Sequence, residues 1–88
     1  MKVTWSDAAL ADLSAAIDYI ELFDQPAAYR LAERLVGCAD SLEIFPNRGT
    51  PLPDGRRQIS IIYPYLLRYR VLEDCVEIDS IRHGARAD

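Results

Sequence analysis

The feature that most constrains the fold is a pair of alternating segments near the end of the chain. Residues 66–72 (LLRYRVL) and 75–81 (CVEIDSI) each alternate apolar with charged side chains, and the acidic pair Glu73-Asp74 separates them. A period of two is typical of a strand with one buried face, and a two-residue connection predicts a β-hairpin. The two segments are therefore expected to be antiparallel neighbours in a sheet.

Residue types predict the register of this hairpin. A two-residue turn at 73–74 sets Tyr69 opposite Ile78 on the apolar face. On the other face, the predicted structural ion pairs join Arg70 to Glu77 and Arg68 to Asp79. Each cross-strand pair of these kinds contributes roughly 0.2 to 1 kcal/mol, so one register is strongly favoured.

The alternation slips near the end of the second segment. Ser80 takes the phase of the core residue Ile78, whereas the apolar Ile81 takes the opposite phase. A β-bulge near Asp79-Ser80 would return Ile81 to the core. The final residues are then expected to leave the sheet at an angle set by this irregularity.

The first half of the chain has a helical period. After the short β-prone segment 2–5 (KVTW), apolar residues recur every three or four positions, which predicts helices at about 7–22 and 26–44. Pro26 suits the first turn of the second helix, and Pro46 ends it. The stripe expected to face the core from the first helix is Leu10, Leu13, Ile17 and Ile20. Helices joined by a few residues form an antiparallel hairpin.

These elements predict an α+β fold: an N-terminal strand, an antiparallel helix hairpin and then a three-stranded antiparallel sheet. The three strands are expected at 57–62, 66–72 and 75–81, after a proline-containing loop at 46–55. A chain of 88 residues has room for one domain and not for two, so a single domain is expected to span 1–88.

Charge is unevenly distributed along the chain. The net charge is −4, with three basic and eight acidic residues in 1–45, against seven arginines and six acidic residues in 46–88. Nine of the ten basic residues are arginine, which favours bidentate ion pairing over diffuse basic attraction. Because affinity for a nucleic-acid backbone scales with the phosphates neutralised, we expect no direct sequence-specific nucleic-acid binding.

Composition also bounds the cellular setting. No apolar run approaches the roughly 20 residues of a membrane helix, and the N-terminus lacks a signal-peptide pattern. We expect a cytoplasmic protein with no membrane partner. Cys38 and Cys75 lack the spacing of a zinc site and are interpreted as small buried hydrophobes. No glycine-rich phosphate loop is present, and we expect no cofactor and no metal.

Three stretches, in order along nearly the whole chain, resemble the RelE/ParE toxin superfamily. They are VTWSDAALADLSAAIDYI, AAYRLAERLVGCADSLEIFPNRG and PYLLRYRVLEDCVEIDSIRHGAR. The resemblance implies the fold derived above and the role of a small toxin in a bacterial type II toxin–antitoxin pair. RelE-like members cut messenger RNA in the ribosome, whereas ParE-like members poison DNA gyrase by binding. An antitoxin encoded beside the toxin silences either kind.

Two target mechanisms follow from that resemblance. A nuclease could use His83 for proton transfer and an arginine for phosphate. However, Leu66 occupies the position matched to a catalytic arginine of RelE-type nucleases, and Leu52 that of a loop glutamate. We therefore expect a ParE-like inhibitor that binds DNA gyrase, and not an enzyme with a catalytic set. The expected target-binding residues are Arg56, Arg57, Arg82, His83 and Arg86.

The expected protein partner is a cognate, ParD-like antitoxin that folds on the toxin. Coupled folding lets a disordered tail cover a large surface. Two receptors are plausible for it: the groove along the helix hairpin, and a free edge of the sheet. A further alternative is an inactive homologue whose sole partner is an antitoxin.

Overall fold

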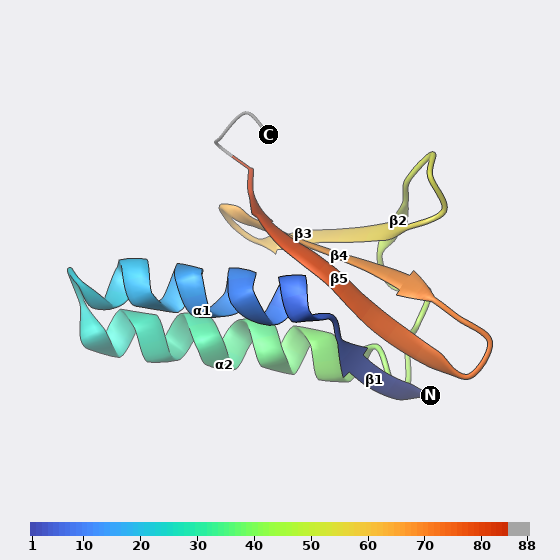
Figure 1. Cartoon of the computed structure of the whole chain (residues 1–88), viewed down its shortest axis with the longest axis horizontal. Coiled ribbons are helices and arrows are strands. Elements are labelled where there is room, and N and C mark those ends of the chain that lie inside the picture. The colour runs from blue at the N-terminus through green and yellow to red at the C-terminus, as the bar shows by residue number, and fades with distance from the viewer. Residues whose placement is uncertain (85–88) are drawn as a thin grey trace.

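The computed structural model describes residues 1–84, which contain one mixed five-stranded sheet (Figure 1). The strands are β1 (Lys2–Trp5), β2 (Thr50–Pro51), β3 (Arg57–Ile62), β4 (Tyr65–Val71) and β5 (Cys75–His83). Their order is β1-β5-β4-β3-β2, and β1 runs parallel to β5 while the other neighbours are antiparallel. The α+β class is confirmed, but the sheet is larger than the three strands predicted. The N-terminal strand joins one edge, and the short β2 joins the other.

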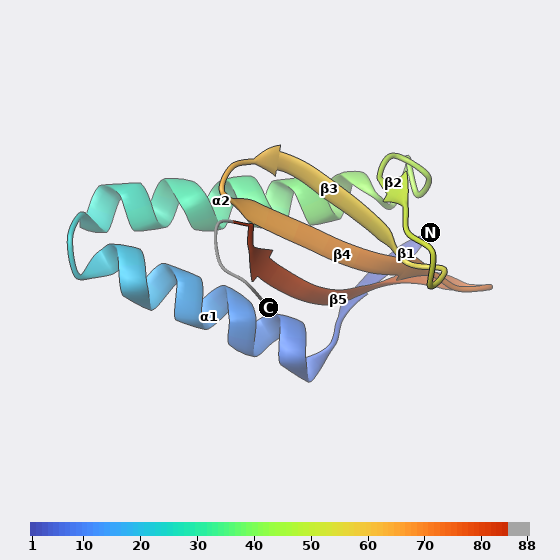
Figure 2. The same ribbon diagram turned by 90° about the horizontal axis from the view of Figure 1, so that it is seen from above.

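Two helices, α1 (Asp7–Glu21) and α2 (Gln25–Ser41), cover one face of the sheet (Figure 2). Ser6 Oγ caps α1 by accepting the Ala9 N–H at 3.0 Å, and Asp24 caps α2 in the same way. The second helix ends three residues before the predicted 44. Its last turn tightens into i→i+3 hydrogen bonds, as at the end of many helices.

The face that α1 buries differs from the predicted stripe. Leu10 is half exposed, whereas Ala9 and Ala16 are buried and Leu13 packs at the edge of the core. Small side chains let a helix approach its neighbours closely, so the alanines occupy the centre of this contact. The period was predicted correctly, and Leu13, Ile17 and Ile20 are half-buried, so the predicted stripe fails at Leu10 and omits the two buried alanines.

The core lies between the helices and the sheet. Its largest fully buried side chains are Leu35, Leu42, Leu67, Tyr69, Val76 and Ile78. Tyr69 also fixes the loop that follows α2, because its hydroxyl donates to the Pro46 carbonyl and accepts the Gly49 N–H, both at 2.8 Å. A Cβ at Gly49 would lie 2.9 Å from the Tyr69 ring, so this approach requires glycine.

The predicted β-bulge is confirmed. Tyr69 faces Ile78, whereas Arg68 faces Ser80, so Asp79 is the extra residue on β5. Ile81 thereby returns to the helix-covered face and is buried. The predicted partnership of Arg68 with Asp79 is wrong for the same reason, since the bulge removes Asp79 from the position opposite Arg68.

Neither cysteine forms a disulfide. Cys38 is buried, as predicted, and burial raises the pKa of its thiol; Cys75 is half-buried. Neither α1 nor α2 is long and apolar enough to cross a membrane, and these are the helices of the described chain.

Candidate functional site

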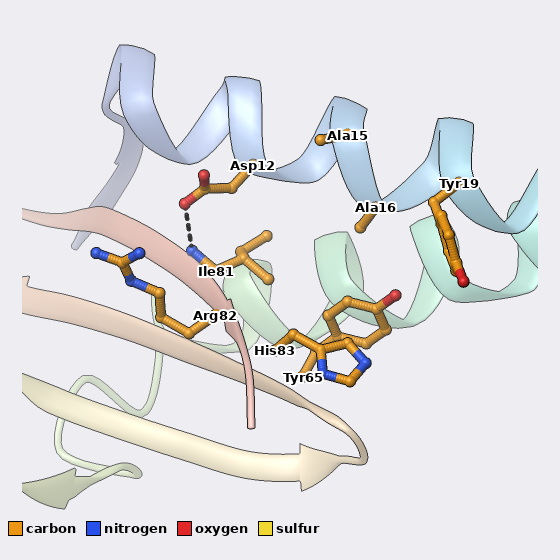
Figure 3. A pocket seen from close by; sticks show the side chains of 8 residues that line it. All are labelled: Asp12, Ala15, Ala16, Tyr19, Tyr65, Ile81, Arg82 and His83. Carbon is orange, nitrogen blue, oxygen red and sulfur yellow. Dashed lines mark hydrogen bonds between the residues drawn. The ribbon is translucent and has the colours of Figure 1, made fainter. Parts of the chain in front are cut away.

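A groove of about 320 Å³ lies between α1 and the end of the sheet where β4 begins and β5 ends (Figure 3). Its lining residues are Asp12, Ala15, Ala16, Tyr19, Tyr65, Ile81, Arg82 and His83. Small side chains on α1 leave room above the strands, while the strands supply aromatic and titratable groups. The groove therefore combines an apolar wall with polar atoms, as ligand sites commonly do.

Along one wall of this groove, the edge of β5 has no neighbouring strand. The parallel strand β1 pairs with β5 only from Cys75 to Ile78. Beyond Ile78, side chains of α1 and of its N-cap residue bond to this edge instead of a strand. Ser6 Oγ donates to the Asp79 carbonyl at 2.9 Å, and Asp12 accepts the Ile81 N–H at 2.9 Å. A helix carboxylate thus occupies a position that a neighbouring strand would otherwise fill.

His83 lies at the inner end of the groove. Its ring meets that of Tyr65 edge to face, with centroids 5.4 Å apart. Its Nδ1 atom is buried and has no hydrogen-bond partner among residues 1–84. His83 is half-buried and does not belong to the buried core.

The side chains of Arg82 and His83 point in different directions, although the two residues are consecutive. Successive side chains of a strand alternate between faces, so His83 lies on the helix-covered face with Tyr65, which is opposite it across the strands. Arg82 points the other way, as Figure 3 shows. A proton-transferring histidine and a phosphate-holding arginine at these positions do not converge on one reacting group.

The five predicted target-binding residues are not gathered in one place. Arg57 is opposite Tyr69 and His83 is opposite Tyr65, so about four residues of strand, roughly 13 Å, separate the two ends. Arg86 lies outside the described residues. The predicted cluster therefore divides into an end near β2 and an end at the groove.

The two arginines near β2 make internal contacts. Arg57 donates to the Gly49 carbonyl at 2.7 Å and to the Asn47 carbonyl, which ties down the loop after α2. Arg56 binds Asp54, two residues before it, and reaches across the sheet to Asp79, each at 2.8 Å. The side-chain hydrogen bond from Arg56 lowers the pKa of the Asp54 carboxyl below its ordinary value.

The predicted ion-pair ladder is not formed. Within residues 1–84, Arg56 makes both of the ion pairs shorter than 4.0 Å. Arg70 faces Glu77 in the predicted register, but their charged atoms do not reach that distance. Arg68 instead donates from Nε to the Gln58 side chain at 2.9 Å.

Two contributors to the site were missed in the sequence. Asp12 was not singled out, although it lies three residues after the buried Ala9 and four before the buried Ala16. A carboxylate on the inward face of an amphipathic helix was the available signal. Tyr65 precedes the predicted strand at 66–72, and no signal identified it. Across residues 1–84, no three His, Cys, Asp or Glu side chains are grouped to hold a metal ion.

A helix hairpin on one face of a mixed sheet, with an arginine-bearing face left open, is the arrangement expected of small RelE/ParE-type toxins. Residues 3–88 match the family model described as "ParE toxin of type II toxin-antitoxin system, parDE", and the chain belongs to that family. It is thus a toxin of a type II toxin–antitoxin system.

Relatives support the assignment. The chain is 45% identical to "Toxin RelE2" of Caulobacter vibrioides over 85 residues, which cover 97% of each chain. It is 32% identical to "Putative toxin Y4kP" of Sinorhizobium fredii, over 94% of this chain and 88% of that one. A solved structure titled "Chromosomal ParDE TA system from P. aeruginosa" is similar in fold, with a TM-score of 0.81 and 25% identity, covering 94% of this chain and 95% of that one.

Proposed function

We propose that this toxin acts as a ParE-like inhibitor that binds DNA gyrase, and that a cognate antitoxin neutralises it. The observation that carries the proposal is the divergence of Arg82 and His83. Cleavage of RNA needs proton-transferring groups and phosphate-binding cations around one phosphate. The only histidine instead faces the helix side of the sheet, and Arg57 is occupied by loop carbonyls.

A binding inhibitor needs no such convergence. It requires a rigid surface with side chains that anchor a partner, and arginine, tyrosine and tryptophan are common anchors. Arg82 is exposed at the rim of the groove, and Tyr19 of α1 lines the same groove with half of its side chain exposed. The target-binding surface is proposed to include Arg82 and His83, while Arg56 and Arg57 position the loop and the sheet.

The antitoxin is proposed to occupy the groove between α1 and β5. The apolar surface of the groove continues beyond it, because the Tyr19 ring packs edge to face on the exposed Phe23 ring at 5.3 Å. An amphipathic segment could cover this surface with its apolar side.

Ribosome-dependent cleavage of messenger RNA is the second candidate. It is favoured by the name of the relative "Toxin RelE2", which is 45% identical to this chain. Against it stands Leu66, an apolar residue at the position matched to a catalytic arginine of RelE-type nucleases. A third candidate is a homologue that binds an antitoxin without being toxic.

Inducible expression in a bacterium distinguishes these candidates. We expect filamentation with an induced DNA-repair response, and relief of both when the neighbouring antitoxin gene is expressed. Rapid arrest of protein synthesis without the repair response would favour message cleavage. Normal growth, with the antitoxin still binding the purified chain, would identify an inactive homologue. Leu67→Ala, which removes a core side chain, is the control for effects of unfolded protein.

A further inference from the structure

No described helix covers the other face of the sheet (Figure 1). The two ends of this face differ in their balance of charged side chains. At the end near β2, carboxylates accompany the arginines: Arg56 binds Asp54 and Asp79, and Arg70 faces Glu77. These three carboxylates offset the two arginines there. Little positive charge at that end remains available to an outside ligand.

At the other end the positive charge is not balanced. Arg68 uses Nε to hold Gln58, which leaves its two terminal amino groups without a partner among residues 1–84. Arg82 is exposed and makes no hydrogen bond or ion pair with the described residues. Arg68 faces Ser80 and Leu66 faces Arg82, so the two arginines are diagonal neighbours, about 7 to 8 Å apart between Cα atoms.

Ser80 lies between these arginines and is 7% exposed. It faces Arg68 across the strands and precedes Arg82 by two positions on the same side of β5. Its hydroxyl is buried and has no partner in residues 1–84. Buried polar atoms are nearly always hydrogen-bonded, so an unpaired hydroxyl between two unpaired cations indicates a missing acceptor. The bulge at Asp79 creates this arrangement, because it removes the carboxylate that would otherwise face Arg68.

We propose that Arg68, Ser80 and Arg82 form a binding site for the carboxylate of an acidic side chain on a protein partner. A carboxylate has two oxygens, which can accept from both guanidinium groups and from the Ser80 hydroxyl. Two arginines suffice for one such group, whereas binding along a nucleic acid relies on several phosphate contacts. The site does not depend on whether the toxin's target is gyrase or the ribosome.

The test uses a short fluorescent polyglutamate peptide and the full-length protein at low salt. Fluorescence anisotropy gives its affinity, and NMR gives the shifts of the Arg68 and Arg82 Nε–H signals. We expect saturable binding that Arg68→Gln and Arg82→Gln each weaken about tenfold, because each removes a charge-assisted, bidentate contact. Ser80→Ala should weaken it about threefold, because it removes one hydrogen bond from an uncharged donor. Arg34→Gln, an exposed arginine on α2, is the matched control and should change nothing.

Three results would overturn the proposal. One is absence of saturable binding, and another is equal loss of binding in Arg34→Gln and Arg82→Gln. The third is tighter binding of an oligothymidylate of equal charge with the same dependence on Arg68 and Arg82, since that would make the site a phosphate site. If a glutamine variant fails to fold, Arg68→Lys and Arg82→Lys keep the charge and remove the planar fork. These lysine variants should still bind the peptide more weakly than the wild type, because lysine does not replace a bidentate arginine.

Discussion

The two faces of the sheet differ in what their side chains contact. On the helix-covered face, Leu67, Tyr69 and Ile78 are fully buried. On the open face, Arg68 is only half-buried and Arg82 is exposed, although each is adjacent in sequence to a core residue. Alternation along a strand separates packing from recognition within a few residues. Substitutions on one face should therefore change stability, and substitutions on the other should change binding.

The largest expected effect comes from breaking the covered face. Leu67→Ala should lower the free energy of unfolding by about 2 to 5 kcal/mol, because it leaves a cavity in a close-packed core. Leu66→Ala, on the open face of the same strand, should cost less than about 1 kcal/mol. Urea unfolding followed by circular dichroism measures both, and similar losses would contradict the assignment of the faces.

The next effect tests a polar link from the covered face to the loop after α2. Tyr69→Phe should destabilise the protein by about 1 to 3 kcal/mol, since it leaves the buried Gly49 N–H and the Pro46 carbonyl without their partner. Tyr63→Phe is the control, because that tyrosine is exposed. Equal midpoints for the two variants in urea would show that the hydroxyl of Tyr69 contributes nothing.

These buried contacts mark the boundary of what the sequence could predict. Local signals sufficed for the hairpin, the bulge and the helix hairpin, because period, capping and turn length act over a few residues. The parallel pairing of β1 with β5 joins the two ends of the chain, and no local pattern encodes it. The hydroxyl of Tyr69 likewise finds acceptor and donor in a loop about twenty residues away.

A third substitution tests the edge of β5 that α1 contacts. Asp12→Ala removes the acceptor of the Ile81 N–H and should cost about 1 to 2 kcal/mol. It should also speed hydrogen exchange at Ile81. Asp18→Ala, on the exposed side of the same helix, should leave that exchange rate unchanged. Unchanged exchange in Asp12→Ala would exclude the carboxylate as the cap of this edge.

The site was predicted less completely than the fold. Arginine and histidine near the C-terminus were singled out as candidates, and Arg82 and His83 line the groove, but their side chains divide between opposite faces. Charge partners were predicted from a register without the extra residue, so Arg68 was paired with Asp79. The bulge itself was predicted. The partner that Asp79 has in the structure is Arg56, which reaches it across the sheet, and such a long-range contact has no local signal in the sequence.

A smaller effect on stability, with a large one on function, is expected for Arg82→Ala. The free energy of unfolding should change by less than about 0.5 kcal/mol, because the side chain is exposed and unpaired. Growth inhibition should nevertheless fall, since the residue belongs to the proposed target-binding surface. Arg34→Ala serves as the control in a growth assay with matched expression levels. Full toxicity of Arg82→Ala would remove this arginine from the surface.

The smallest effect concerns pH and the balanced end of the open face. The pKa of Asp54 is lower in the folded protein than its ordinary value, so its ion pair stabilises the fold above the unfolded pKa, about 3.9. This contribution is lost as the pH falls through the folded pKa. The stability difference between wild type and Asp54→Asn should be constant above about pH 5 and shrink below about pH 4. A difference that grows on acidification would reverse the assigned sign.

The central claim is that the toxin inhibits DNA gyrase by binding and does not cleave message. The most direct measurement adds purified protein to gyrase with relaxed plasmid, and separately to ribosomes programmed with messenger RNA. We predict loss of supercoiling or accumulation of cleaved plasmid, reversed by the antitoxin, with the messenger RNA intact. Normal gyrase activity together with codon-dependent cleavage of the ribosome-bound message would contradict the account.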